Sequence, residues 1–345
     1  MRVISATEHG LSPDDWDGFV HTRDDSSFCH LHGWSTVMTR ALGHRCTYLA
    51  AVDGQDVQGV LPLVRVRSAL FGHYLVSVPF LNYGGPLGSE GAVRALGEEA
   101  AERAAQSGVD LLELRSRLEV VVPPLTTNTR KVTVLLDLPS DPEALWKDGL
   151  TAKVRSQVRR PQKEGMTTRF GPRELDAFYR VFSRGMRDLG TPVLPRAFFE
   201  HTVAELGDRV ELAVVYLDDV PVAAGCGFVW RDEFEITWAA SLREYNRMAP
   251  NMLLYWSLMV RMIERGMQVF NFGRCTPGGG THRFKRQWGD AYDVPLPWAQ
   301  WSPTGVAATP NAEGRPLFRY ATQAWSRLPL AVANLLGPPL ARNLP

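Results

Sequence analysis

The chain has few cysteines, no long uncharged apolar run and no surplus of one charge sign. Its 345 residues include four cysteines, none paired in a CxxC motif, so we expect a reduced, cytoplasmic protein. The N-terminal sequence MRVISATEHG lacks the apolar core of a signal peptide. The longest apolar run, Leu328 to Ala341, is shorter than the roughly 20 residues of a membrane-spanning helix and contains three prolines.

The charges are nearly balanced. Lys and Arg total 38 and Asp and Glu total 37, which gives a net charge of +1. We therefore expect no whole-chain attraction to DNA or to an anionic membrane, and any such contact must come from a local patch. A composition of 45% apolar and 22% charged residues is typical of globular proteins. At roughly 100–200 residues per domain, the length predicts two domains.

Strand and helix patterns alternate along the chain, which predicts a mixed α/β fold. In the first half, strands are expected at 45–52, 56–66, 74–79, 109–114 and 131–138, with a helix at 91–106. In the second half, helices are expected at 151–165, 174–189, 196–206 and 252–265, with strands at 210–217, 220–230, 233–240, 269–272 and 294–301.

Two segments suggest an internal duplication. GVDLLEL, from Gly108, and GMQVFNF, from Gly266, both run Gly, apolar, polar, apolar, apolar, polar, apolar, which aligns Glu113 with Asn271. We predict two copies of one sheet-and-helix unit, at 1–145 and 146–305, and a tail helix in 306–345. In the tail, apolar residues near helical spacing from Pro316 to Leu328 predict a helix that either lies on a membrane surface or packs across the two domains.

The densest set of hydrogen-bond donors lies in FNFGRCTPGGGTHRFKRQWG, which runs from residue 270 to 289. Three consecutive glycines are costly to order, and such a loop often persists because a substrate approaches its backbone. The segment lacks the GxxxxGK[ST] spacing of a P-loop. The alternative is a flexible loop with solvated charges. The candidate donors are Arg274, Thr276, His282, Arg283, Lys285 and Arg286.

A basic segment precedes the 270–289 segment in the sequence. Between residues 147 and 173 there are eight basic and two acidic side chains, a local charge of +6. Arg155, Arg159 and Lys163 recur at helical spacing on one face, so a phosphate-bearing ligand is one inference and a solvated face is the other. Pro161 should kink this helix.

Other kinds of site find no support in the sequence. The spacing of Cys29, His30, His32, His44 and Cys46 matches no usual zinc site, so we expect no metal. The chain contains neither a GxSxG nucleophile motif nor a GxGxxG dinucleotide motif.

The basic segment KVRSQVRRPQKEG, followed about 120 residues later by FNFGR and FKRQWG, resembles the FemAB-type peptidyltransferases, a branch of the GNAT acyltransferase superfamily. FCHLHGWSTVMTRALGH and VSVPFLNYGG resemble the subgroup found beside exosortase (PEP-CTERM) and exopolysaccharide gene clusters. The resemblance implies two tandem GNAT-like domains, each a twisted mixed sheet flanked by helices. It also implies acyl or aminoacyl transfer to an amine of a cell-envelope precursor, such as that of peptidoglycan or an exopolysaccharide.

The resemblance also implies site residues. It places Lys285 in the reaction site, with Phe284 beside it. Substrate-binding roles are predicted for Lys153, Arg155, Arg159, Trp34, Tyr83, Asn271 and Thr276.

The chain departs from the family pattern at two places. Relatives often have Asp where this chain has Asn271, which weakens the case for a carboxylate base there. The usual glycine-containing pyrophosphate loop is replaced by REYNRMAPN, in which Pro250 also removes a backbone amide. Backbone amides at a helix N-terminus hold a pyrophosphate, so acetyl-CoA bound in the usual way is disfavoured in the second domain.

We therefore predict direct attack of the acceptor amine on the donor carbonyl, without a covalent enzyme intermediate. Lys285 stabilises the oxyanion, with Arg274 or Arg283 in support, and a substrate phosphate or Glu235 takes the proton. No cofactor is expected to be tightly bound, and the activated donor is aminoacyl-tRNA or, alternatively, acyl-CoA or acyl carrier protein. The expected acceptor is a saccharide or peptide precursor with phosphate.

A second alternative is a non-catalytic scaffold of the same fold. In either case the protein is expected to be cytoplasmic, with a peripheral contact at the inner membrane face through 316–341.

Overall fold

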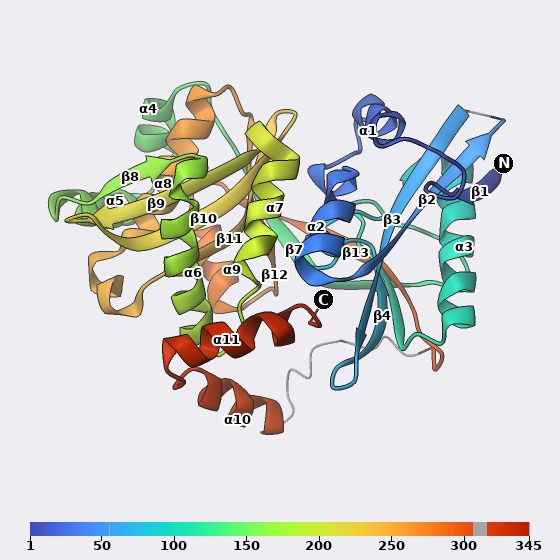
Figure 1. Cartoon of the computed structure of the whole chain (residues 1–345). Helices are drawn as coiled ribbons and strands as arrows, with labels where there is room; N and C mark the ends of the chain where they lie inside the picture. The colour runs from blue at the N-terminus through green and yellow to red at the C-terminus, as the bar shows by residue number, and fades with distance from the viewer. Residues whose placement is uncertain (55, 306–315, 345) are drawn as a thin grey trace. The chain divides into compact units, whose positions relative to one another are not determined.

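The computed structural model describes residues 1–54, 56–305 and 316–344 (Figure 1). The chain forms two compact units, each assembled from separate stretches. Unit 1 comprises Met1–Lys131, Pro295–Ala312 and Arg342–Pro345, and unit 2 comprises Val132–Val294 and Glu313–Ala341. The domain boundaries predicted at 145/146 and 305/306 stay predictions.

Unit 1 is built on a mixed sheet. Its strand order is β1 (Arg2–Ser5), β2 (Arg45–Asp53), β3 (Asp56–Ser68), β4 (Gly72–Val76), β6 (Leu111–Leu114) and β13 (Tyr292–Trp301), with β5 (Leu87–Gly88) paired to β3. The β4 and β6 strands are parallel, whereas the other pairs are antiparallel. The helices are α1 (Pro13–Thr22), the short 3-10 helix η1 (Phe28–His30), α2 (Gly33–Leu42) and α3 (Glu90–Ser107).

The bounds and the buried face of the α3 helix follow from its sequence. The Ser89 hydroxyl accepts from the Ala92 amide at its start, and Gly108 ends it in the left-handed conformation, at φ 61°. Small and apolar side chains at every fourth position place one face against the sheet core, at Ala92, Leu96, Ala100 and Ala104. The helix predicted at 91–106 and its stop at Gly108 are thus confirmed.

Unit 2 is also built on a mixed sheet. Its strand order is β7 (Thr126–Asp137), β12 (Val269–Cys275), β11 (Glu233–Ser241), β10 (Val220–Trp230), β9 (Val210–Leu217) and β8 (Thr167–Phe170). Its helices are α4 (Pro142–Ala144), the π-helical turn η2 (Leu145–Gly149), α5 (Ala152–Lys163), η3 (Pro172–Glu174), α6 (Leu175–Leu189), α7 (Arg196–Leu206), η4 (Gly207–Arg209), η5 (Arg243–Met248), α8 (Pro250–Glu264), α9 (Gly280–Arg286), α10 (Pro316–Trp325) and α11 (Leu330–Ala341). The α8 helix packs its apolar side chains against β9, β10 and β11.

The two units repeat one topology. In each, antiparallel strands lead to a strand that pairs in parallel with the strand after a long helix, which is α3 in unit 1 and α8 in unit 2. The parallel registers end at Val76↔Glu113 and at Glu235↔Asn271. Glu113 and Asn271 therefore hold equivalent places, as the aligned segments predicted. The last strand of each sheet comes from a distant part of the chain, namely β13 in unit 1 and β7 in unit 2.

The tail differs from its prediction. In place of one helix over 316–328, α10 ends at Trp325 and α11 begins at Leu330, directly after Pro329, whose ring is favoured at helix starts. Arg187 on α6 donates to the carbonyl of Leu328 at 2.8 Å. The side chains of Leu317 and Phe318, which carried part of the predicted apolar face, lie outside the described residues.

No helix within 1–54, 56–305 or 316–344 combines the length and the apolar character needed to cross a bilayer.

Candidate active site

The end of the parallel pair in unit 2 gathers buried polar side chains. The β11 and β12 strands pair as far as Glu235↔Asn271, after which β11 continues along β10 and β12 along β7. Glu235 and Asn271 are 1% and 0% exposed at this point. Buried polar groups need hydrogen-bond partners, so their surroundings determine what the site can do.

The Asn271 amide is fully hydrogen-bonded. Its oxygen accepts from the Thr133 hydroxyl at 2.6 Å and from the Gly273 amide at 2.8 Å. Its nitrogen donates to Glu233 at 2.8 Å and to Glu235 at 3.3 Å. An aspartate here would bring a third carboxylate beside two others and could not donate to them when ionised. An asparagine here therefore suits this chain's two glutamates.

Lys285 lies next to this network. It is 5% exposed, and its ammonium donates to the carbonyls of Gly273 at 2.7 Å and Arg274 at 2.9 Å. Burial lowers its pKa to about 8, an effect that Cys275 and Glu235 partly oppose. An ammonium group has three N–H donors, so two bonds to carbonyls leave one for another oxygen. A poised, partly desolvated cation of this kind is typical of functional sites.

The structure brings some of the predicted residues to Lys285 and leaves others at the surface. Arg274 is half-buried and contributes its carbonyl to Lys285. Arg283 is exposed and donates to the carbonyl of Gly278 at 2.7 Å, whereas Thr276 is exposed before the glycines. Phe284 packs edge-on against Tyr255, with ring centroids 4.9 Å apart. The short α9 helix, which carries Phe284 and Lys285, was not foreseen from the sequence.

Two of the basic side chains of helix α5 contact residues of the preceding helical turn. The Arg155 guanidinium donates to the carbonyls of Trp146, Lys147 and Leu150, which end the preceding helical turn. Arg159 lies 5.1 Å from the centroid of the Trp146 ring, while Lys153 is exposed. Pro161 lies in the last turn of the helix, and the kink predicted there stays a prediction. Ligand-binding roles for these three residues stay predictions.

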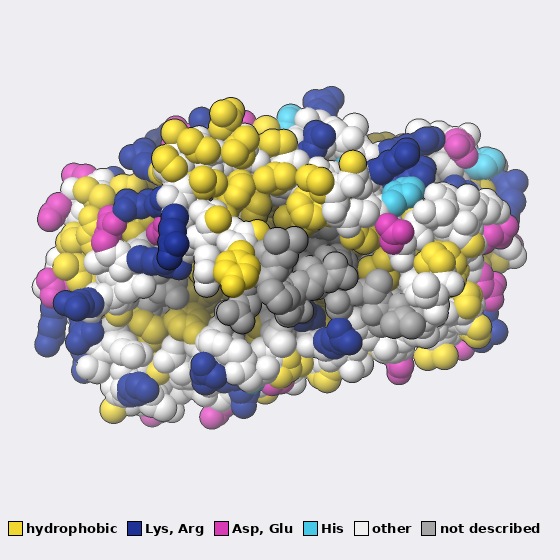
Figure 2. All heavy atoms as spheres, turned by 90° about the horizontal axis from the view of Figure 1, so that it is seen from below, with side chains coloured by type: hydrophobic (Ala, Val, Ile, Leu, Met, Phe, Trp, Pro, Cys, Tyr) yellow, Lys and Arg dark blue, Asp and Glu magenta, His cyan; other side chains and the backbone are white. Residues whose placement is uncertain are grey.

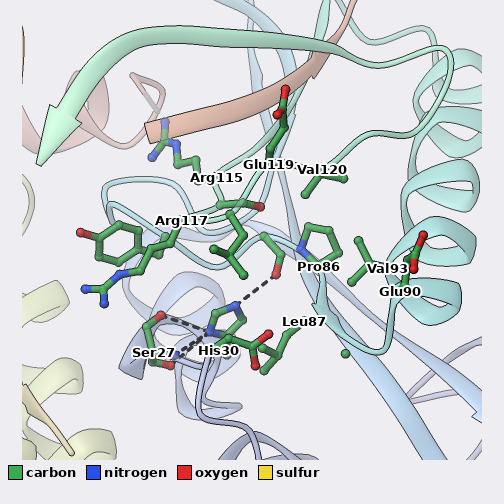
Figure 3. A pocket seen from close by; sticks show the side chains of 16 residues that line it. Ser27, His30, Pro86, Leu87, Glu90, Val93, Arg115, Arg117, Glu119 and Val120 are labelled. Carbon is green, nitrogen blue, oxygen red and sulfur yellow. Dashed lines mark hydrogen bonds between the residues drawn. The ribbon is translucent and has the colours of Figure 1, made fainter. Parts of the chain in front are cut away.

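The two predicted residues of unit 1 have different surroundings. Trp34 is fully buried, and its indole N–H donates to the carbonyl of Phe28 at 2.9 Å, so in this structure its side chain belongs to the core. Tyr83 lines a pocket of about 200 Å³ (Figure 3). Arg117 lies 4.2 Å from the centroid of its ring.

The pocket of unit 1 occupies the place that corresponds to the Lys285 site of unit 2. It is lined mainly by the segments that follow the parallel strands β4 and β6, at 83–88 and 115–120. Gly85 in this wall lies so close to Ser116 that an added Cβ would be 1.9 Å from its hydroxyl. A side chain at that position would therefore close the pocket or displace its wall.

A buried ion pair supports this pocket. The Arg115 guanidinium donates to Glu113 at 2.8 Å and to the carbonyl of Leu81 at 2.9 Å. The other Glu113 oxygen accepts from Gln300 on β13 at 2.7 Å. Arg115 and Glu113 are 1% and 4% exposed. The sequence analysis did not predict a role for Arg115, although it did align the neighbouring Glu113 with Asn271.

His30 closes the pocket from below in the view of Figure 3. Its Nδ1 accepts from the Ser27 amide at 3.0 Å, so the ring proton resides on Nε2, which donates to the carbonyl of Gly85 at 3.1 Å. Burial lowers the pKa of His30 to about 4. The ring is therefore neutral at pH 7.

His30 should make the folded state less stable as pH is lowered. Between pH 6.5 and about 4 the unfolded chain binds a proton that the folded chain does not, so the folded state loses on the order of 3 kcal/mol as pH falls through this window. Urea unfolding at several pH values, compared between the wild type and His30→Gln, isolates this contribution. Parallel pH profiles for the two proteins would show that His30 is not its source.

Among the described residues, no three His, Cys, Asp or Glu side chains group as metal ligands would. All four cysteines are free thiols.

Residues 151–286 match the family described as an acetyltransferase (GNAT) domain. The matched stretch runs from the start of α5 to the end of α9 and so includes Asn271 and Lys285. No curated protein matches the sequence of this chain.

Several solved structures share the fold. The crystal structure of FemX matches with a TM-score of 0.64 at 15% identity, covering 94% of this chain and 100% of that one. The C-terminal domain of a putative lysylphosphatidylglycerol synthetase from Agrobacterium fabrum matches with a TM-score of 0.57 at 14% identity, covering 85% and 92%. A tandem GNAT protein from the clavulanic acid biosynthesis pathway matches with a TM-score of 0.52 at 12% identity, covering 89% and 99%.

These likenesses confirm the predicted fold of two tandem GNAT-like units with a helical tail. Together with the domain match, they identify an enzyme of the acyltransferase class.

Proposed function

We propose that this acyltransferase moves an acyl or aminoacyl group from an activated donor to an amine of a cell-envelope or exopolysaccharide precursor. Lys285 stabilises the oxyanion of the reaction. The observation that supports this most strongly is the buried Lys285 ammonium, held by two carbonyls where β11 and β12 part, with one donor left over.

The proposed reaction follows from direct attack. The amine nitrogen forms a bond to the donor's carbonyl carbon, and the carbonyl electron pair moves to oxygen. The third N–H of Lys285 donates to that oxygen. Because the site is desolvated, this bond is stronger than it would be in water. When the oxyanion collapses, the bond to the donor's leaving group breaks and the amide remains.

The amine must also lose a proton. Glu235 is the nearest buried carboxylate to the network, but it already accepts from Asn271 and from the Thr237 hydroxyl at 2.9 Å. Both of these bonds occupy the lone pairs with which it would accept the proton of the amine. A phosphate of the substrate is the alternative acceptor, for which the exposed Lys153 on α5 is a candidate contact.

The donor is proposed to be an aminoacyl-tRNA. GNAT folds typically use acyl-CoA, whose pyrophosphate needs backbone amides at a helix start. Here α8 begins at Pro250, which lacks an amide, after a 3-10 helix without glycine, Arg243–Met248. The name of one structural neighbour, a putative lysylphosphatidylglycerol synthetase, includes an aminoacyl group and so also fits a donor of amino-acid type.

Donor binding tests this choice. We expect purified protein to transfer a labelled amino acid from charged tRNA to an amine acceptor, and to bind acetyl-CoA no more tightly than millimolar. Filter binding and single-turnover transfer measure the two donors side by side, with uncharged tRNA and desulfo-CoA as controls. Micromolar binding and turnover of acetyl-CoA would instead favour the acyl-CoA alternative.

A peripheral membrane location is the second candidate property. Figure 2 shows hydrophobic side chains gathered over α11. This helix exposes Val332, Leu335 and Leu336, and Leu335 is 75% exposed. This face supports contact with an apolar surface. It also supports the scaffold alternative, which an activity loss in Lys285 variants would exclude.

A further inference from the structure

Unit 1 contains a second pocket, which is strongly basic. Its volume is about 250 Å³. No carboxylate lines it, whereas four of its eight lining residues are arginines. The lining residues are Leu42, Gly43, His44, Arg45, Arg65, Arg67, Arg342 and Asn343.

The strand register forces these charges together. Arg45 on β2 lies directly opposite Arg65 on β3, and Arg67 follows two residues later on the same face of the sheet. Like charges in directly opposed positions destabilise a strand pair. The carboxyl-terminal end of α2, at Gly43, offers only about half a negative charge to offset them. Among the described lining residues no carboxylate offsets the four arginines, and an anionic ligand would supply that counter-charge.

Two histidines bond to arginine residues of the pocket, one to the main chain of Arg342 and the other to the side chain of Arg65. The buried His44 ring bonds the Arg342 carbonyl through Nε2 at 2.7 Å, and burial lowers its pKa. Arg65 Nε donates to Nε2 of His73 at 2.6 Å. That histidine must be neutral at Nε2 to accept the bond. The Arg65 guanidinium is thus oriented by a neutral partner, which does not cancel its charge.

We propose that this pocket binds the phosphate group of a small phosphate ester. Guanidinium groups match phosphate oxygens in pairs of hydrogen bonds, and four of them around one pocket supply positive charge for an anionic phosphate group. A volume of about 250 Å³, close to the roughly 300 Å³ at which pockets for drug-sized ligands begin, accommodates a phosphate headgroup. The proposal is independent of the donor and acceptor proposed above.

The phosphate could be carried on a lipid or on a soluble metabolite. The run that leads to Arg342 along the chain, from 328 to 341, has no charged residue. That sequence makes an anionic phospholipid one source and a soluble phosphate ester the other. Both present the same group to the arginines.

The test pairs two variants of equal charge. Arg45→Gln/Arg67→Gln removes two exposed pocket arginines, and Arg94→Gln/Arg130→Gln removes two exposed arginines of unit 1 outside the pocket. Calorimetry with glycerol 3-phosphate, and sedimentation with phosphatidylglycerol or phosphatidylcholine vesicles, separate the two sources. We expect the pocket variant to bind at least about 10-fold more weakly in one of the two assays, and the control to bind like the wild type.

Loss of glycerol 3-phosphate binding identifies a soluble ligand, and loss confined to phosphatidylglycerol vesicles identifies a lipid. Equal binding by the pocket and control variants in both assays overturns the proposal. So does a defect seen only with tRNA, which would make the cluster a nucleic-acid contact. Urea unfolding of Arg45→Gln/Arg67→Gln distinguishes a loss of binding from misfolding. Because this variant removes opposed like charges, its stability should equal or exceed that of the wild type.

Discussion

Replacing Lys285 by alanine should lower kcat by about 10²–10³-fold, the usual effect of removing one donor to an oxyanion. The ammonium is buried and held by two carbonyls of β12. Arg283, the cation next to it on α9, is exposed and bonded to Gly278. The effect should therefore appear in the chemical step, which single-turnover transfer measures.

A matched variant separates chemistry from packing. Lys285→Met keeps the length and volume of the side chain but removes its donors, so it should lose as much activity as Lys285→Ala while unfolding at a similar urea concentration to the wild type. Arg286→Met, on the exposed side of α9, is the control and should retain full turnover. Full turnover in Lys285→Met would remove Lys285 from the reaction.

Replacing Arg115 by methionine should destabilise unit 1 by about 3–5 kcal/mol, because it leaves the Glu113 carboxylate buried without its cation. Gln300 would remain as a neutral donor to Glu113, and it cannot balance a charge. Urea unfolding of the full chain, monitored by the tryptophan fluorescence of Trp298 and its neighbours, measures the loss.

The double variant Arg115→Met/Glu113→Gln provides the internal control. It removes both charges and retains the bond from Gln300, so most of the lost stability should return. If the single variant is as stable as the wild type, Glu113 is not held as an ion and the pocket does not depend on this pair.

The sequence predicted the repeated elements well because they combine apolar patterns with strong local stop signals. The bounds of α7, β9 and β10 agree with their predictions. The turn between β9 and β10 is formed by Asp218 and Asp219, both with positive φ, a conformation that short polar side chains tolerate. The alignment of Glu113 with Asn271 also succeeded, since both residues end a parallel pair.

Other features could not be predicted because they depend on distant partners. Strand β7 follows β6 in the chain yet pairs with β12, and β13 reaches back to β6. The α9 helix begins in a run of glycines, which disfavours helix locally, and Lys285 ties it to β12.

The candidate site was predicted only in part, because some of its features also depend on residues that are distant in the sequence. A motif could mark Lys285, but it could not show that the Trp34 side chain is enclosed in the core, because buried and substrate-facing tryptophans look alike in sequence. The ion pair of Arg115 gave no local signal either, since Gln300 lies 187 residues from Glu113.

The most direct test of the central claim is the pH dependence of kcat/KM for the wild type and Lys285→Arg. A protonated Lys285 is the active form in the proposed mechanism, so the wild-type rate should fall as pH rises through about 8. Arginine stays charged, so in Lys285→Arg this descending limb should disappear from the range below pH 10. A wild-type rate that instead rises through pH 8, with the rise lost in the variant, would show that Lys285 acts as a base and contradict the oxyanion role.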